Sequence, residues 1–198
     1  MPKLFVLMGK SATGKDTIYK ELLKIDRLEL KEVVIYTTRP IREGEKDGIE
    51  YFFVSNERLR ELKEEGKIIE IREYNTVHGI WSYFTVDDGQ IDLDKHNSLI
   101  IGTLESYEQI RNYYGRDKVY PIYIETDDGV RLQRALDREK LQETPRFAEM
   151  CRRYLADEED FSEENLKKLG INKRYYNFEL ASCVKEIVND IKLISKDK

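Results

Sequence analysis

The chain has 198 residues, of which 40% are hydrophobic and 37% are charged, and its formal net charge is −5. These values are typical of one folded domain with a charged surface, and they argue against a general nucleic-acid-binding protein. The N-terminal apolar run is too short for a signal peptide or a membrane span. Two cysteines, Cys151 and Cys183, show no metal-binding spacing, and His78 and His96 alone cannot form a metal cluster. We therefore expect a cytoplasmic protein that binds neither nucleic acid nor membrane.

Strand and helix patterns alternate along most of the chain. Runs of β-branched and aliphatic residues predict strands buried on both faces, and amphipathic spacing predicts helices. This alternation predicts an α/β fold with a largely parallel sheet. Pro121 either weakens the fourth strand or places it near an edge of the sheet. The expected strands are 3–8, 31–37, 98–103 and 118–124, and the expected helices are 16–26, 104–114, 128–140 and 181–194.

Two regions depart from this alternation. Residues 36–88 predict a small inserted subdomain, in which short strands surround a helix with Ser55 as its N-cap and Gly66 as its stop. Residues 128–170 are strongly charged and helical, which is typical of an exposed, mobile segment. The expected organisation is a core made of 1–35, 89–127 and 171–198, with 36–88 and 128–170 as separate units. The short strands are expected at 49–54, 67–74 and 80–86.

A glycine-rich stretch, MGKSATGKDT, follows the first strand and has the spacing G-x-x-x-x-G-K. Glycine tolerates the backbone angles that turn several N–H groups towards a phosphate, and the following helix adds its free N–H groups and its dipole. A lysine at this spacing adds a full positive charge against the outer phosphates. The stretch therefore predicts a nucleoside triphosphate site rather than an ordinary strand-to-helix turn. The expected contacts are Gly9, Ser11, Ala12, Thr13, Gly14, Lys15, Asp16 and Thr17.

Asp16 stands where this pattern has a Ser or Thr that binds magnesium. A carboxylate is a good Mg²⁺ ligand, and without the metal it repels phosphate oxygens. One hypothesis is therefore that Asp16 binds Mg²⁺ while Thr17 contacts an inner phosphate, which predicts a steep magnesium dependence of ATP binding. The other is that Asp16 points outward and caps the helix.

A second constellation follows the strand at 31–37. Arg39 and Arg42 lie close enough in sequence to clamp one dianionic phosphate with paired donors, and Tyr51 can reach the same phosphate. Glu70 is a carboxylate with apolar neighbours, which suits a purine that offers adjacent N–H and amino donors, as guanine does. Singly, each of these residues reads as an ordinary surface or strand residue. Beside a phosphate-binding loop they indicate an acceptor site.

These motifs resemble those of the guanylate kinase family, P-loop enzymes that pass the γ-phosphoryl group of ATP to GMP. GKSATGKDT matches the family's loop, and TTRPIREGEKDGIEYFF matches its GMP-binding motif, apart from a proline shifted by one position. The resemblance implies a P-loop NTPase-type sheet flanked by helices, with 36–88 as an NMP-binding subdomain and 128–170 as a helical lid. It also implies that Arg39, Arg42 and Tyr51 hold the GMP phosphate, that Glu70 faces guanine, and that Thr38 belongs to the same substrate-binding site.

Later motifs depart from the family's pattern. In VHGIWSYFT, Trp81, Ser82 and Tyr83 are the nearest counterparts of a Y-G-[ST] motif that contacts phosphate and guanine. The family's D-x-D-x-x-G motif is replaced by IIGTLES, so Thr103 stands at the second acid and Glu105 is the only nearby one. These changes affect guanine specificity more than phosphate binding.

The resemblance also assigns arginines of the lid and one residue near adenine. Arg134 and Arg138 share a helix face, and either Arg152 or Arg153 matches a further lid arginine. Asn177 lies near the family's asparagine beside the adenine. Without the phosphate loop, these arginines would be read as solvated surface residues.

The expected reaction is ATP plus GMP giving ADP plus GDP, with Mg²⁺. Phosphoryl transfer needs alignment and charge neutralisation more than covalent chemistry, so the expected catalytic residues are cations: Lys15, Arg39, Arg134, Arg138 and Arg152. Two alternatives stay open. Related P-loop kinases of ribosyl phosphates carry the same G-K-D, and a degenerate guanylate-kinase-like domain would bind partners without catalysis. The sequence leaves the oligomeric state open.

Overall fold

The computed structural model describes residues 1–76 and 79–196, so His78 lies outside the described residues. A parallel sheet forms the core, in the order β2-β7-β1-β8-β9. This arrangement confirms the expected α/β class. The strands are β1 (Leu4–Met8), β2 (Lys31–Glu32), β7 (Ser98–Ile101), β8 (Val119–Glu125) and β9 (Tyr175–Tyr176).

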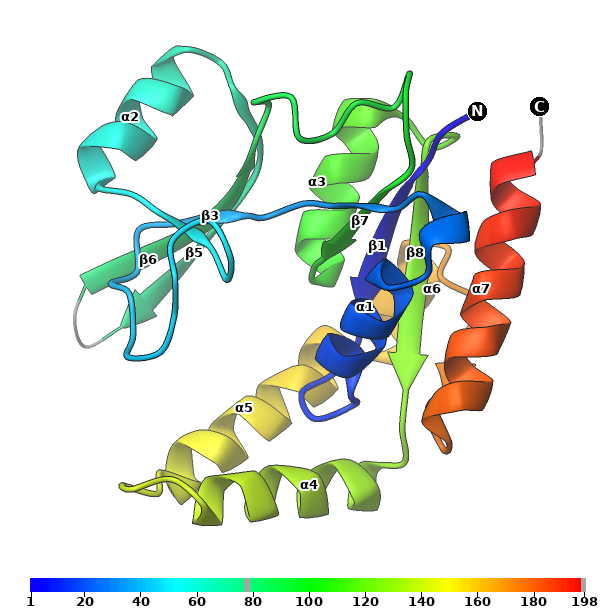
Figure 1. Ribbon diagram of the computed structural model, residues 1–198. Coiled ribbons are helices and arrows are strands. Elements are labelled where there is room, and N and C mark those ends of the chain that lie inside the picture. The colour runs from blue at the N-terminus through cyan, green and yellow to red at the C-terminus, as the bar shows by residue number, and fades with distance from the viewer. Residues whose placement is uncertain (77–78, 197–198) are drawn as a thin grey trace.

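Both faces of β1 are covered, because alternate residues of a strand point to opposite faces. Leu4, Val6 and Met8 pack with α3 and with the segment after α5 (Phe147–Asp160), while Phe5 and Leu7 pack with α1 and α7. Figure 1 shows α1 and α7 on one side of the sheet and α3 on the other. Burial on both faces explains why the sequence of β1 is an unbroken apolar run. The helices are α1 (Lys15–Leu23), α3 (Leu104–Tyr114), α6 (Glu163–Lys168) and α7 (Leu180–Lys196), and a 3-10 helix spans Asp26–Leu28.

The expected core strand at 31–37 is divided between two sheets. Its start, β2, pairs with β7, whereas its end forms β3 (Tyr36–Thr37) in a second sheet. Between these two strands, the Gln90 side chain forms the hydrogen bonds that a neighbouring strand would form. It accepts from Val34 N at 2.9 Å and donates to Val34 O at 3.2 Å. The expectation of one continuous core strand was therefore wrong, because a side chain replaces the ladder at Val34.

Pro121 lies in β8 opposite Val6 of β1. On the other side of β8, β9 pairs only with Ile124 and Glu125. Pro121 therefore lies beside an unpaired stretch, where its missing N–H breaks no ladder bond. The edge interpretation of this residue is confirmed.

The second sheet has the order β4-β3-β6-β5 and carries α2 on one face. Apolar residues of α2 pack on Phe84 and Val86, which gives this sheet a small core of its own. Ser55 caps α2 as predicted, since its hydroxyl accepts from Arg58 N at 3.2 Å. The elements are β4 (Phe52–Phe53), α2 (Asn56–Glu64), β5 (Ile68–Thr76) and β6 (Gly79–Val86).

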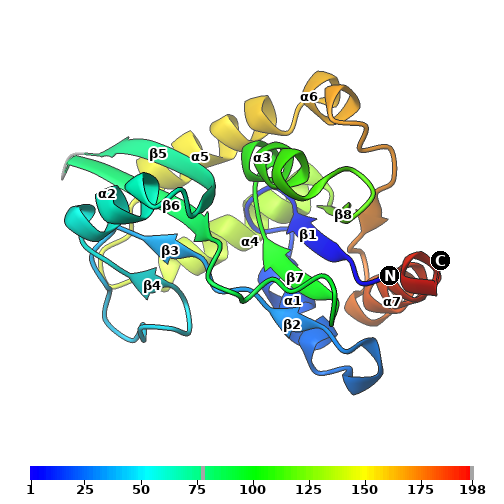
Figure 2. The same ribbon diagram turned by 90° about the horizontal axis from the view of Figure 1, so that it is seen from above.

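The two sheets are joined through α3 and β5. The amide of Gln109 on α3 accepts from Ile71 N at 3.0 Å and donates to Ile71 O at 3.1 Å. A side-chain amide thus pairs with the edge of β5 as a neighbouring strand would. In Figures 1 and 2 the second sheet lies to one side of the core, and α5 runs beneath it.

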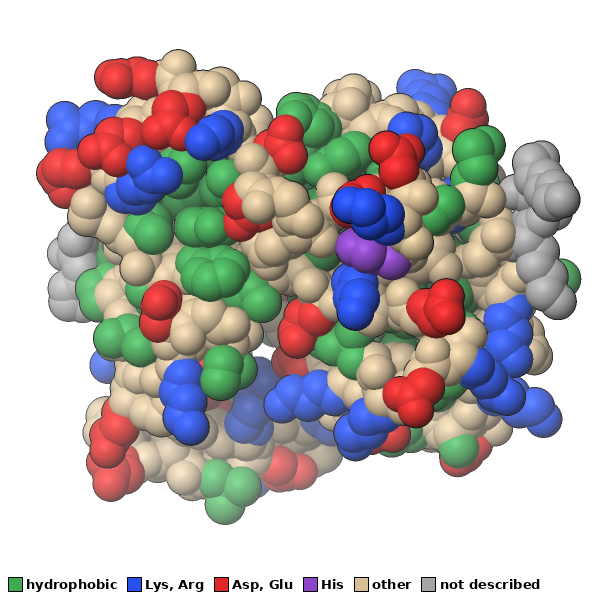
Figure 3. All heavy atoms as spheres, turned by 45° about the horizontal axis from the view of Figure 1, so that its top comes forward, with side chains coloured by type: hydrophobic (Ala, Val, Ile, Leu, Met, Phe, Trp, Pro, Cys, Tyr) green, Lys and Arg blue, Asp and Glu red, His purple; other side chains and the backbone are tan. Residues whose placement is uncertain are grey.

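The charged segment after β8 forms two helices, α4 (Asp128–Lys140) and α5 (Phe147–Asp160). On the face that Figure 3 shows, basic and acidic side chains are interspersed. None of the helices in the described part of the chain combines the length and apolar composition needed to cross a bilayer.

We predict that Ile187→Ala lowers the free energy of unfolding by about 3 kcal/mol, because the side chain is fully buried against β1 and α1 and truncation leaves a cavity. Leu193→Ala on the same helix is the control, since Leu193 is 64% exposed, and its effect should stay within about 0.5 kcal/mol. Urea unfolding followed by circular dichroism measures both. Equal effects of the two substitutions would contradict this account of the core.

Candidate functional site

The glycine-rich loop joins β1 to α1 at the C-terminal end of the core strands, where ligands bind in open α/β sheets. Gly14 is the N-cap of α1 and has φ 88°, a left-handed conformation that glycine adopts without strain. A Cβ on Gly9 would lie 2.7 Å from the carbonyl oxygen of Ile124, and one on Gly14 would lie 2.6 Å from Asn177 Nδ2. Both glycines are therefore required by close packing as well as by conformation.

The carbonyl of Thr13 is tied to the core from two directions. Asn177 Nδ2 donates to it at 2.7 Å, and Thr126 Oγ1 donates at 3.3 Å. The hydroxyl of Thr13 donates back to Lys10 O at 2.9 Å. With the Thr13 carbonyl bonded in this way, the loop is held in a fixed shape around its N–H groups. Asn177, which the sequence associated with a nucleotide, is buried and contacts the loop backbone.

Lys15 begins α1 and lies among charged groups. Burial lowers the pKa of Lys15, and the carboxylates of Asp16 and Asp157 oppose this shift. The guanidinium groups of Arg138 and Arg131 add to it. The structure therefore brings the predicted Lys15 and Arg138 together. Asp16 and Thr17 are exposed in the first turn of α1, and Asp16 is not the N-cap, because Gly14 occupies that position.

Two acids of α5 bind the phosphate loop. Asp157 Oδ2 accepts from Ser11 N at 2.7 Å, and Glu158 Oε2 pairs with Lys10 Nζ at 2.5 Å. The Asp157 carboxylate thus binds the N–H group of Ser11, which the sequence analysis assigned to phosphate. Sequence reasoning missed this contact, because it read the acidic run at the end of α5 as exposed.

Arg131 is a further residue around the loop that sequence reasoning missed. Its side chain is 0% exposed; Nε donates to Ser11 O at 3.1 Å, and Nη1 pairs with Glu158 at 2.7 Å and with Asp128 at 2.5 Å. Its guanidinium also lies 4.8 Å from the ring centroid of Tyr154. A buried arginine with these partners links α4, α5 and the loop in the conformation that the structure shows. The sequence did contain one sign of its location: Arg131 lies one helical turn before Arg134, so both side chains share a face of α4.

The predicted lid arginines lie in different surroundings. Arg134 Nη1 lies 3.5 Å from Ala12 O, at the outer side of the loop. Arg152 is exposed and forms a bidentate pair with Glu149 at 2.7 and 2.8 Å, and Arg153 lies 3.7 Å from the same carboxylate. Arg134 and Arg138 are therefore near the loop, whereas Arg152 and Arg153 are paired on their own helix.

A polar face of the second sheet carries the predicted acceptor residues. Arg39 is buried and forms a bidentate pair with Glu45 at 2.8 and 3.0 Å. Its guanidinium lies 5.3 Å from the ring of Tyr51, and the ring of Tyr51 lies 5.7 Å from that of Tyr83. Arg42 is exposed beside them, with its backbone N bonded to Glu45 at 2.8 Å. Glu45 thus orients Arg39 and holds the loop that carries Arg42.

The same face continues along β5 and β6. Residues two apart on a strand share a face, so Glu70, Arg72 and Tyr74 lie together. Burial raises the pKa of Tyr51 and of Tyr74, and the charge of Arg72 opposes the shift in both. Arg72 was not identified from the sequence, although its alternation with Glu70 was visible there. Across the strands, the register pairs Glu70 with Thr85, Arg72 with Tyr83 and Tyr74 with Trp81.

Glu70 does not present a free carboxylate. Its side chain is 0% exposed and pairs with Arg72 at 3.0 and 3.2 Å, and Thr85 Oγ1 donates to it at 2.8 Å. The Thr103 hydroxyl already has a structural role, because it accepts from Ser106 N and caps α3. Thr38 Oγ1 accepts from Ser82 N at 2.9 Å, which fixes the start of the arginine-bearing loop against β6.

A cavity of about 290 Å³ separates this face from the core and α5. Tyr74 lines it from the second sheet, Thr103 and Glu105 from the start of α3, and Asp160 from the end of α5. Burial raises the pKa of Glu105 and of Asp160. The cavity therefore lies where the second sheet, α3 and the charged helices meet.

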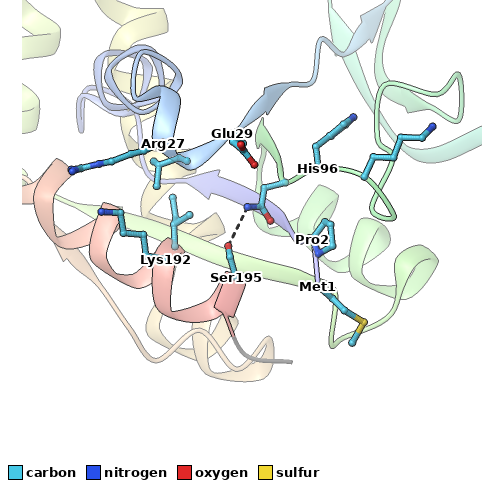
Figure 4. A pocket seen from close by; sticks show the side chains of 11 residues that line it. Met1, Pro2, Arg27, Glu29, His96, Lys192 and Ser195 are labelled. Carbon is cyan, nitrogen blue, oxygen red and sulfur yellow. Dashed lines mark hydrogen bonds between the residues drawn. The ribbon is translucent and has the colours of Figure 1, made fainter.

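Another cavity, of about 330 Å³, lies near the N-terminus and is shown in Figure 4. Met1, Pro2 and His96 line it, and Asn97 Nδ2 donates to Ser195 Oγ at 3.2 Å across it. It lies at the N-terminal end of β1, away from the loop and from the polar face. It is therefore not part of the candidate site.

Comparisons with known proteins agree with the resemblance noted in the sequence. The family model for guanylate kinase matches residues 1–148. A guanylate kinase of Clostridioides difficile is 44% identical over 77 residues, which are 38% of this chain and 37% of the relative. One of Oceanobacillus iheyensis is 34% identical over 91 residues, 44% of each chain. The chain thus spans less than half the length of the curated relatives it matches.

The crystal structure of a guanylate kinase from Anaplasma phagocytophilum has a similar fold. Its TM-score is 0.67 at 21% sequence identity, and the match covers 100% of this chain and 87% of that chain.

We predict that Asp157→Asn strengthens ATP binding in the absence of Mg²⁺ about tenfold. The substitution weakens a charge-assisted hydrogen bond to Ser11 N, a class that contributes about 1.5–3 kcal/mol, and removes a negative charge beside Lys15. Titration calorimetry measures the affinity. Glu159→Gln is the control, because Glu159 is exposed on the same helix and the net charge changes equally. Unchanged affinity in Asp157→Asn would show that this carboxylate does not compete with phosphate.

Proposed function

The chain belongs to the guanylate kinase family, and on that premise we propose that it transfers the γ-phosphoryl group of ATP to GMP. The observation that carries the proposal is the pairing of two sites. A phosphate loop with Lys15 stands at the end of β1, and an arginine–tyrosine face stands on the neighbouring sheet. Direct transfer between two phosphates requires both, since its catalysis is mainly positioning and charge neutralisation.

In this proposal the loop holds the ATP phosphates through its backbone N–H groups and the N-terminus of α1. Lys15 neutralises charge on the outer phosphates, and Arg138 and Arg134 add positive charge beside the same loop. Removing one preorganised donor of this kind typically costs about 3 kcal/mol of the barrier. Asp157 leaves Ser11 N when phosphate arrives, since both cannot accept from the same N–H.

The acceptor's phosphate is held by Arg39 and Arg42, with the Tyr51 and Tyr83 hydroxyls as further donors. Glu45 takes one edge of the Arg39 guanidinium, which leaves other N–H groups for phosphate, because arginine has five. A preoriented guanidinium loses less freedom on binding, and the cations offset repulsion between the two anionic substrates.

The residues of the loop fit a magnesium ion. Mg²⁺ takes one or two carboxylates together with substrate phosphate oxygens and water. Asp16 is exposed in the first turn of α1 and close enough to Lys15 to oppose the lowering of its pKa. We propose Asp16 as the protein ligand, with Thr17 on an inner phosphate. The bound metal supplies positive charge against the transferring phosphoryl group.

We further propose that residues 128–170 act as a lid. Arg152 is paired with Glu149 and exposed, so reaching the transferring group requires α5 to move and the pair to exchange partners. A helix held to the loop mainly by charged contacts suits such a movement. Closure excludes water, which otherwise competes for the phosphoryl group.

The proposal is tested by following ADP production from Mg·ATP with GMP, dGMP, AMP, UMP, CMP and ribose bisphosphate offered in turn. Turnover highest with GMP supports it. Turnover only with ribose bisphosphate would replace GMP by a ribosyl phosphate, and the failure of ATP to bind would indicate an interaction domain.

We predict that Arg42→Ala raises the KM for GMP at least tenfold and leaves the KM for ATP within twofold. The exposed guanidinium beside Tyr51 contributes to one substrate site only, and a charge-assisted hydrogen bond contributes about 1.5–3 kcal/mol. Arg60→Ala, on the outer side of α2 and paired with Glu57, controls for the change in net charge. Steady-state kinetics measures both constants, and a parallel rise in the KM for ATP would count against the assignment.

We predict that Mg²⁺ strengthens ATP binding more than tenfold in the native chain and much less in Asp16→Asn. Without the metal the carboxylate repels phosphate, and with it the carboxylate is a ligand. Calorimetric titration of ATP with and without Mg²⁺ gives both ratios. Equal metal dependence in the two proteins would exclude Asp16 as the ligand. Asp26→Asn, in the 3-10 helix after α1, is the control.

A further inference from the structure

The Glu70 carboxylate already accepts three hydrogen bonds from donors of the chain itself. Oε2 accepts from Arg72 Nε at 3.0 Å, and Oε1 accepts from Arg72 Nη2 at 3.2 Å and from Thr85 Oγ1 at 2.8 Å. The side chains of Glu70 and Arg72 are 0% and 7% exposed. A buried bidentate pair of this kind is costly to open, because separation leaves two uncompensated charges in a poorly solvated place.

Arg72 lies within the proposed acceptor face rather than behind it. It is paired in register with Tyr83, and its charge opposes the raised pKa of Tyr51, as that of Arg39 does. It also opposes the raised pKa of Glu105, which lines the cavity below the face. An acceptor substrate bound between Arg39 and this cavity therefore contacts the Arg72 guanidinium and not a free Glu70 carboxylate.

A free carboxylate and a guanidinium select opposite features of a purine. The carboxylate accepts from ring N1–H and from a 2-amino group, so it distinguishes guanine from bases that lack that amino group. A guanidinium only donates, and its favoured partners on a 6-oxopurine are O6 and N7. Those two acceptors are common to guanine and hypoxanthine.

We propose that Arg72 is a specificity-determining residue of the acceptor site, and that it makes the site select 6-oxopurine nucleoside monophosphates with little regard to the 2-amino group. This inference rests on the proposed function and specifies its substrate class: GMP and IMP are both acceptors. The mechanism is competition within the chain. Arg72 holds the Glu70 carboxylate that would read the amino group, and in this proposal its remaining N–H groups donate to O6 and N7 of the purine.

The test measures equilibrium binding of GMP and IMP by calorimetry without ATP. In the native chain we expect the two affinities to agree within about threefold. In Arg72→Ala the released carboxylate should favour GMP at least tenfold, and the double variant Arg72→Ala with Glu70→Gln should return the ratio towards one. Arg72→Lys, which keeps a cation beside Glu70, should stay closer to the native ratio than Arg72→Ala. Circular dichroism shows which variants are folded.

Glu70→Gln alone keeps the test decisive if Arg72→Ala fails to fold. It should leave the ratio of GMP to IMP affinity unchanged, since the native carboxylate does not read the base. A native preference for GMP above tenfold that Glu70→Gln abolishes would overturn the inference, and so would binding of neither nucleotide. The proposed function fails separately: a chain that binds both nucleotides equally but transfers no phosphoryl group would contradict the reaction and support the assignment of Arg72.

Discussion

The shape of the glycine-rich loop depends on the carbonyl of Thr13. It accepts from Asn177, which follows β9, and from Thr126, which follows β8. A loop with this many polar backbone groups would otherwise adopt several conformations, because glycine adds freedom as well as close approach. Fixing one carbonyl from two strands removes that freedom. The order of the core sheet is what brings those strands beside the loop.

The charged residues around the loop are explained by the positive potential of the loop itself. A loop that gathers N–H groups, a half-buried lysine and the N-terminus of a helix has a strongly positive potential. Asp157 and Glu158 supply opposite charge from α5, and Arg131 binds both the loop and those acids. Asp157 holds α5 against the loop through Ser11 N, one of the N–H groups that the proposed mechanism assigns to phosphate. If that mechanism holds, nucleotide binding and movement of α5 are coupled through this hydrogen bond.

The sequence predicted what local chemistry determines. The loop spacing, the buried run of β1 and the cap at Ser55 each depend on neighbouring residues, and each is found in the structure. The strand at 31–37 was mispredicted because Gln90, far along the chain, bonds Val34 and redirects the backbone. Local strand propensity contains no information about a hydrogen-bonding residue as distant in sequence as Gln90 is from Val34.

Sequence analysis also could not predict which partners the charged side chains bind. Glu70 was expected to offer its carboxylate to a base, but that carboxylate binds Arg72, two residues away and on the same face. Period-2 alternation predicts that the two side chains are neighbours, and it leaves open whether they bind each other or a ligand. For Asn177 the residue was identified, while its contact with the loop depends on β9 joining the sheet.

Four cations in or near these two sites pair with a carboxylate of the chain: Arg39 with Glu45, Arg72 with Glu70, Lys10 with Glu158 and Arg152 with Glu149. The pairs differ in burial, and burial decides which can exchange partners. Arg152 and Glu149 are exposed, so separating them costs little. Arg72 and Glu70 are enclosed, so a ligand that needs the carboxylate must first separate two buried charges. Exposed pairs therefore suit a helix that moves between contacts, whereas the enclosed pair fixes the chemical character of the face on which an acceptor base would lie.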